Sequence, residues 1–178
     1  MRTFVLALLV LLLPLPLLAQ STVLTTQERT RILAESLAAA PHCPSVQKLR
    51  SVGADVDSLL TNIALNKTIF LEVRLKAVDC LGYFSNKRSR QVLNSMITDP
   101  TFDSPFQQAA LLSLARAFGE EAFPLLRSYT DNTDAKTRVV AVKALGIIGS
   151  ARTRSYLMGL AQSETDPMVQ QAIAEALK

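Results

Sequence analysis

The sequence is poor in the residues on which most catalytic and metal sites depend. Its 178 residues include one histidine, two cysteines, six glycines and no tryptophan. Metal sites usually need clusters of histidine, cysteine and carboxylate side chains, and His42 and Cys43 are neighbours that cannot form a closed site by themselves. No Gly-rich phosphate loop is present. We therefore expect no catalytic residues, no metal ligands and no cofactor.

Long hydrophobic runs are also scarce, and the one that is present lies at the N-terminus. Residues 4–13 are uninterrupted apolar residues between an arginine and two prolines. This order predicts a secretory signal peptide over residues 1–19, with cleavage after Ala19 or, alternatively, after Ser21. The other alternative is an uncleaved membrane anchor, although a span needs about 20 apolar residues. We expect residues 20–178 to be exported, either to the periplasm or out of the cell.

One motif recurs through the rest of the chain. With Thr137 as position 0, the motif places Arg138 at +1, Ala141 at +4, Leu145 at +8 and Gly146 at +9. Offsets 0, +4 and +8 lie on one face of a helix, so these positions should point into a core. The +1 position should have a structural role, in which its side chain bonds to loop carbonyls or aspartates of the adjacent unit.

The motif repeats at a nearly fixed interval. It starts at Val73, Phe106, Thr137 and Val169, which are 33, 31 and 32 residues apart. Such a period is typical of a solenoid, in which each unit buries its apolar face by stacking on its neighbours. Three of the starts are preceded, at a distance of three residues, by a favoured helix N-cap: Asp103, Asp134 and Asp166.

The pattern predicts an all-α protein, an α-solenoid of about five stacked antiparallel helix pairs. Residues 44–178 show it most clearly, and residues 20–53 should form a divergent first unit. The predicted helices span residues 26–39, 45–52, 55–65, 68–84, 89–97, 104–118, 120–129, 135–148, 151–161 and 166–178. Pro124 should kink the seventh of these helices.

Two of the repeated segments resemble a known family. Residues 137–149 (TRVVAVKALGIIG) and 166–177 (DPMVQQAIAEAL) are similar to short HEAT repeats of the phycobilisome-lyase type. This resemblance implies a right-handed superhelix that binds a protein or peptide as a non-enzymatic scaffold. The alternatives are a lyase-type HEAT enzyme or enzyme subunit, and a membrane-tethered structural spacer.

The resemblance also indicates where a partner would bind. In such folds the second helix of each pair lines the concave face, and offsets +2, +6 and +10 should face outward there. The predicted partner-binding residues are Leu75, Asp79, Tyr83, Gln108, Leu112, Arg116, Val139, Lys143 and Ile147. Several are apolar where water alone would favour charge. The alternative is that tight packing of the superhelix buries some of them.

The basic composition, with a pI near 9.3, does not by itself indicate nucleic-acid binding. The loops along one edge alternate in sign: Asp55, then Lys87, Arg88 and Arg90, then Glu120 and Glu121, then Arg152 and Arg154. A phosphate backbone would need a continuous basic stripe. We expect no nucleic-acid partner, membrane contact only through an uncleaved signal segment, and loops that are ordinary solvated turns.

The positions of the two cysteines in the repeat do not favour a disulfide. Cys80 is at offset +7, where the other units have small residues, and Cys43 precedes the helix that should be its neighbour. They should therefore lie near opposite ends of adjacent helices, whereas a disulfide needs Cα atoms within about 7 Å. The favoured interpretation is a buried, unbridged Cys80.

Overall fold

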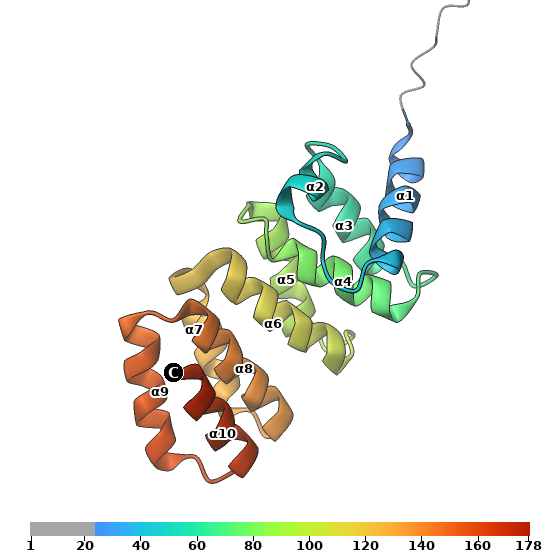
Figure 1. Ribbon diagram of the computed structural model, residues 1–178. Coiled ribbons are helices and arrows are strands. Elements are labelled where there is room, and N and C mark those ends of the chain that lie inside the picture. The colour runs from blue at the N-terminus through green and yellow to red at the C-terminus, as the bar shows by residue number, and fades with distance from the viewer. Residues whose placement is uncertain (1–23) are drawn as a thin grey trace, which may run out of the picture.

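The computed structural model describes residues 24–178, so the predicted signal segment 1–19 lies outside the described residues (Figure 1). The described chain is helical and contains no strand. Its elements are α1 (Thr26–Ala39), α2 (Val46–Arg50), α3 (Val56–Leu65), α4 (Leu71–Leu81), α5 (Lys87–Thr98), α6 (Ser104–Phe118), η1 (Gly119–Ala122), α7 (Phe123–Ser128), η2 (Tyr129–Asp131), α8 (Ala135–Ile148), α9 (Ala151–Ser163) and α10 (Pro167–Ala176). None of these helices is long and apolar enough to cross a membrane.

Local capping explains where several helices begin. Thr25 and Glu28 form a reciprocal capping box at the start of α1. Asp134 accepts hydrogen bonds from two backbone N–H groups of α8, and Asp166 does the same for α10. Asp103 stands at the same offset but makes no side-chain capping bond. The predicted capping role is thus confirmed at two of the three aspartates.

The prediction of one kinked helix over residues 120–129 is wrong. The chain instead forms the short 3-10 turn η1, then α7, then the second 3-10 turn η2. Pro124 lies in the first turn of α7, where its missing N–H removes no helical hydrogen bond. The proline therefore helps to set the start of a shorter helix.

The helix pairs stack into the predicted α-solenoid. The inner helices α4, α6, α8 and α10 contact one another in succession, and Figure 1 shows them lying roughly side by side. The first helix of each pair is an outer helix, and the outer helices α3, α5, α7 and α9 make fewer contacts with one another. Offsets 0, +4 and +8 are buried in the first three motifs, as predicted: Val73, Ala77, Leu81, Phe106, Ala110, Leu114, Thr137, Ala141 and Leu145.

Small residues allow the inner helices to approach one another closely. A Cβ atom added to Gly146 would lie 2.8 Å from the Cβ of Ala176 on α10. A Cβ added to Gly82 would lie 3.0 Å from the Cα of Ser113 on α6. In both places the +9 glycine of one unit faces the small +7 residue of the next. The Leu-Gly pair of the motif therefore encodes contact between units.

The first unit differs from the prediction. Cys43 and Cys80 form a disulfide with Cα atoms 5.5 Å apart. The predicted separation of the two cysteines requires α2 to lie beside α4, whereas in the structure α1 packs against α4. The chain between α1 and α2 brings Cys43 to the last turn of α4. Lys76 fixes the same region, because its ammonium donates to the carbonyls of Leu37 and Ala40 at the end of α1.

Candidate protein-binding face

The solvent-facing surface of the inner helices is named here the inner face. The apolar and aromatic residues of the predicted site divide into two groups on it. Leu75, Leu112 and Val139 are only partly exposed and pack against the core. Tyr83 and Ile147 are 39% and 46% exposed. Tight packing of adjacent units thus covers part of the expected apolar patch, and the rest remains open to solvent.

Three of the predicted residues interact with one another across α4 and α6. The Arg116 guanidinium donates to the Asp79 carboxylate at 2.8 Å and to the Asp79 backbone carbonyl at 3.1 Å. The same guanidinium lies 5.5 Å from the centre of the Tyr83 ring. The charges of this part of the inner face are therefore already paired within the protein.

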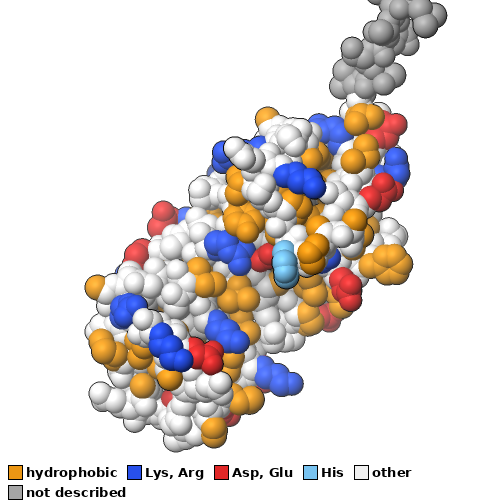
Figure 2. Space-filling model, in the orientation of Figure 1, with side chains coloured by type: hydrophobic (Ala, Val, Ile, Leu, Met, Phe, Trp, Pro, Cys, Tyr) orange, Lys and Arg blue, Asp and Glu red, His pale blue; other side chains and the backbone are white. Residues whose placement is uncertain are grey.

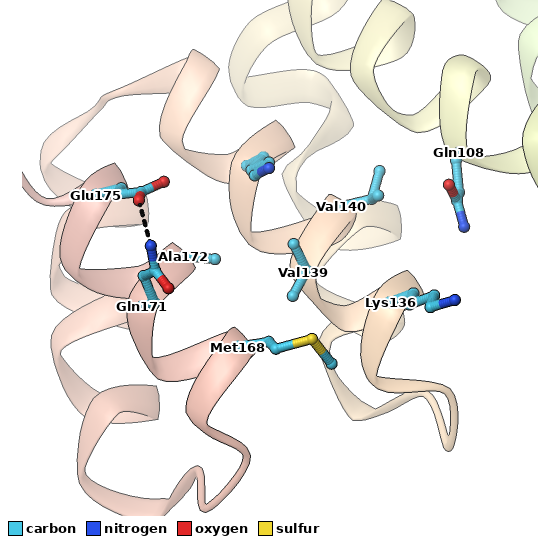
Figure 3. Close-up of a pocket in the computed structure, with 9 residues that line it drawn as sticks. Gln108, Lys136, Val139, Val140, Met168, Gln171, Ala172 and Glu175 are labelled. Atoms are coloured by element: carbon cyan, nitrogen blue, oxygen red, sulfur yellow. Dashed lines mark hydrogen bonds between the residues drawn. The ribbon is translucent and has the colours of Figure 1, made fainter.

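A hollow of about 430 Å³ lies farther along the inner face, between α6, α8 and α10 (Figure 3). We call it the inner groove. It is lined by Gln108, Lys136, Val139, Val140, Lys143, Met168, Gln171, Ala172 and Glu175. Three predicted residues, Gln108, Val139 and Lys143, thus come together in one site. Lys143 and Ile147 also line a second hollow beside it.

Six residues of the groove lining are absent from the predicted site: Lys136, Val140, Met168, Gln171, Ala172 and Glu175. Gln171 and Glu175 occupy offsets +2 and +6 of the last motif. Lys136 and Met168 occupy offset −1 of their motifs, and Val140 and Ala172 occupy offset +3. These offsets lie next to +2 and +6 on a helix of 3.6 residues per turn. The signal was therefore present in the motif, but the prediction used only offsets +2, +6 and +10.

The charges of the inner groove are unevenly paired. Among residues 24–178, all six ion pairs use an arginine, and neither Lys136 nor Lys143 belongs to one. The Glu175 carboxylate accepts a hydrogen bond of 3.0 Å from the Gln171 amide (Figure 3). The groove therefore presents two ammonium groups and one carboxylate.

The apolar floor of the groove is partly open. Val139 and Val140 are partly exposed on α8, and Ala172 is buried on α10. Met168 is 53% exposed, and in Figure 3 its side chain extends from α10 toward α8. A methionine thioether is flexible and polarisable, which suits it to contacts of varied shape.

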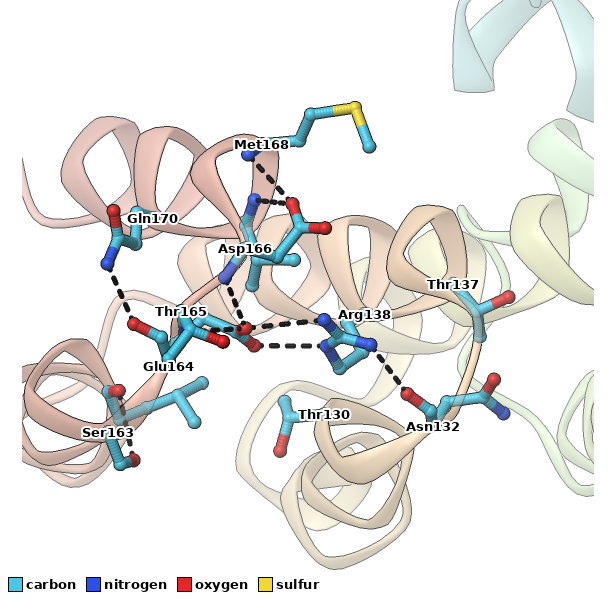
Figure 4. Close-up of polar contacts among 12 residues, drawn as sticks. Thr130, Asn132, Thr137, Arg138, Ser163, Glu164, Thr165, Asp166, Met168 and Gln170 are labelled. Carbon is cyan, nitrogen blue, oxygen red and sulfur yellow. Dashed lines mark hydrogen bonds and ion pairs between the residues drawn. The ribbon is translucent and has the colours of Figure 1, made fainter.

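At the ends of the inner helices, a polar network joins the last two units (Figure 4). Arg138 donates to both carboxylate oxygens of Glu164, at 3.0 and 3.2 Å, and to the carbonyl of Asn132 at 2.9 Å. The Arg138 guanidinium holds the pKa of the Glu164 carboxyl below its usual range, and the backbone N–H groups of Asp166 and Thr165 lower it further. The predicted structural role of offset +1 is confirmed at Arg138.

Two other +1 residues also have a structural role, but they bond within their own unit and not to the adjacent one. Arg74 donates to the Ala64 carbonyl at 3.0 Å, and Gln170 donates to the Glu164 carbonyl at 2.7 Å. Both bonds connect an inner helix to the end of the outer helix before it. These side chains therefore fix the loops and are turned away from the groove.

The alternating charges of the edge loops pair between units. Arg90 bridges to Glu121, and Arg152 lies 3.8 Å from the Glu120 carboxylate. Each arginine also covers an aromatic ring, Phe118 and Phe123 respectively, at 4.1 Å from the ring centre. The prediction that the edge loops are ordinary solvated turns is therefore incomplete, because their charged side chains connect successive units. Figure 2 shows basic and acidic side chains interspersed over the face in view.

Comparison with known families agrees with this geometry. The chain from residue 101 to residue 178, which contains α6 to α10, matches the model for HEAT repeats. These residues are similar to HEAT repeats. The match is to HEAT repeats in general and does not identify the phycobilisome-lyase type. The comparison with curated proteins finds no match.

The segment that matches HEAT repeats includes all three helices that form the inner groove. HEAT units stack into solenoids whose extended surfaces bind partners. Across residues 24–178, no group of three or more histidine, cysteine, aspartate or glutamate residues is arranged to hold a metal ion.

Proposed function

We propose that this chain is an exported, non-enzymatic scaffold that binds a protein or peptide along the inner face of its HEAT solenoid. The observation that carries this proposal is the inner groove, which is formed by three consecutive inner helices. The groove combines partly exposed apolar side chains with two lysines that have no ion-pair partner among residues 24–178. Exposed apolar surface with a polar rim is a common feature of protein-binding sites.

Export is supported by two independent observations. Residues 1–19 have the composition of a signal peptide. Cys43 and Cys80 are joined by a disulfide, a bond that persists mainly in oxidising compartments. Both observations favour the periplasm or the extracellular space over the cytosol.

The test is an affinity pull-down from an extract of the cell envelope, read by mass spectrometry. The wild-type chain is compared with Ile147→Asp/Met168→Asp, which places two carboxylates on the exposed apolar part of the inner face. The matched control is Met158→Asp, because Met158 is 55% exposed but lies on the outer helix α9.

We expect one or more proteins to be captured by the wild type and by Met158→Asp, and to be lost with the double variant. Far-ultraviolet circular dichroism should show the same helical signal for all three proteins. Capture that is unaffected by the double variant would contradict binding at the inner face.

A further inference from the structure

We infer that the inner groove recognises an acidic peptide segment in which carboxylate side chains flank an apolar residue. This inference rests on the proposed function and specifies the chemistry of the partner. It follows from the charge of the groove, from its apolar floor and from a difference between the two halves of the inner face.

The charge of the groove is the first argument. Lys136 and Lys143 are exposed and have no ion-pair partner among the described residues, whereas Glu175 is the single acid of the lining. Asp134, near Lys136 on α8, uses its carboxylate oxygens to cap the helix and to bind the Thr137 hydroxyl. Two ammonium groups therefore remain available to a ligand.

The other half of the inner face supplies the contrast. There, Arg116 is neutralised by Asp79, so an acidic ligand would have to displace an existing ion pair. In the groove neither lysine forms an ion pair with another described residue, and the one acid of the lining, Glu175, accepts a hydrogen bond from Gln171. Complementary charge steers and orients a partner, and an acidic segment should therefore align with α8 and α10 in preference to α4.

The apolar floor of the groove indicates that the ligand also carries an apolar side chain. Val139 and Met168 border the same hollow as the two lysines. An anion that consists only of phosphate or carboxylate would leave this apolar surface in water. A peptide with an aliphatic or aromatic side chain between acidic residues would cover the floor and place its carboxylates on the rim.

The groove also lacks the usual features of a phosphate site. Its lining contains no arginine, although the planar guanidinium is the side chain best suited to bidentate contact with phosphate. Ammonium groups on flexible stems can instead follow carboxylates at variable positions along a peptide. This difference favours an acidic peptide as the occupant.

The experiment is a selection of random 12-residue peptides displayed on phage, with the purified chain as the bait. The selected peptides are then synthesised and their affinities measured by fluorescence anisotropy at low and high salt. Three proteins are compared with the wild type: Ile147→Asp/Met168→Asp, Lys136→Glu/Lys143→Glu and the control Lys48→Glu/Lys87→Glu. The control changes the net charge equally, at exposed lysines outside the groove.

We expect the selected peptides to be rich in aspartate and glutamate beside one apolar residue. Lys136→Glu/Lys143→Glu should weaken their binding by about tenfold or more, and salt should weaken wild-type binding, because rim charges are screened. The control should bind like the wild type.

Two negative results have different meanings. Peptides that are neutral or basic, and that are lost with Ile147→Asp/Met168→Asp but not with Lys136→Glu/Lys143→Glu, would overturn this inference alone. A selection that yields no peptide sensitive to either groove variant would overturn this inference and would also count against the proposed function.

Discussion

The first unit and the C-terminal units of the solenoid bury the same kind of contact in different ways. Between the last two units, the +9 glycine, Gly146, lies against the +7 residue, Ala176. In the first unit no Leu-Gly pair is present, and the +7 residue of the following helix is Cys80, which is bridged to Cys43. The disulfide therefore occupies the same register as the contact between small residues.

This comparison shows what the repeat motif contributes. Where the motif is complete, close packing and the Arg138–Glu164 network join one unit to the next. In the divergent first unit, a covalent bond and contacts from Lys76 and Arg29 hold α1 in place. The two regions should therefore respond differently to reduction, to added side-chain volume and to pH.

The largest expected effect is the loss of the disulfide in Cys43→Ala/Cys80→Ala. Alanine suits offset +7, because Ala144 and Ala176 occupy it in other units. The bond joins residues 37 positions apart, and its removal should lower the free energy of unfolding by about 2–4 kcal/mol in urea titration. The loss should be local, because repeat proteins are stabilised unit by unit.

Hydrogen exchange measures where that stability is lost. Amides of α1 and α2 should exchange faster in the variant, and in the reduced wild-type protein, than in the oxidised protein. Amides of α8 should keep their protection and provide the internal control. Equal loss of protection in α1 and α8 would show that the first unit is not a separate structural element.

A smaller effect should follow from added volume at Gly146. Gly146→Ala places a methyl group against Ala176, and overpacking costs about 1–3 kcal/mol, partly offset by about 1 kcal/mol of gained helix propensity. We expect a net destabilisation of about 1 kcal/mol. Gly159→Ala is the control, because no atom lies within 4 Å of its added Cβ, and it should stabilise the protein by about 0.5–1 kcal/mol.

A double-mutant cycle measures whether Gly146 and Ala176 interact directly. Combining Gly146→Ala with Ala176→Gly restores the space between α8 and α10, so the two changes should be coupled by about 1 kcal/mol in the favourable direction. Additive effects would mean that the glycine is not required for close approach of the two units.

The sequence predicts the repeated part of the fold well, because several local signals agree there. The bounds of α1, α6 and α8 equal the predicted ranges 26–39, 104–118 and 135–148. A period of 3.6 and a following turn define each of these helices, and a capping side chain adds to them at α1 and α8. The path of the chain around Cys43 depends instead on tertiary packing of α1, which no local pattern encodes, and so the disulfide was missed.

The candidate site could be predicted in part for a similar reason. Offsets +2 and +6 predicted that Gln108, Val139 and Lys143 face outward, and all three line the inner groove. Helix periodicity gives the direction of a side chain but not the distance to the next helix. Leu75 and Leu112 are therefore more covered than expected, because small residues bring neighbouring units close together.

The smallest expected effect concerns Glu164. Its contribution to stability should depend on pH in the C-terminal units, whereas Glu35 of the first unit should contribute little at any pH. Glu164 is 8% exposed and has a lowered pKa, chiefly because Arg138 donates to it. Its contribution should be complete above the unfolded pKa of about 4.3 and should disappear as the pH falls through the lower folded pKa. Glu164→Gln should lower the melting temperature by a few degrees at pH 7, and this difference from the wild type should shrink toward pH 3.

Glu35→Gln, which removes an exposed pair with Arg31, is the control and should change the melting temperature little at either pH. A difference for Glu164→Gln that stays constant between pH 7 and pH 3 would show that its carboxylate charge does not stabilise the joined units.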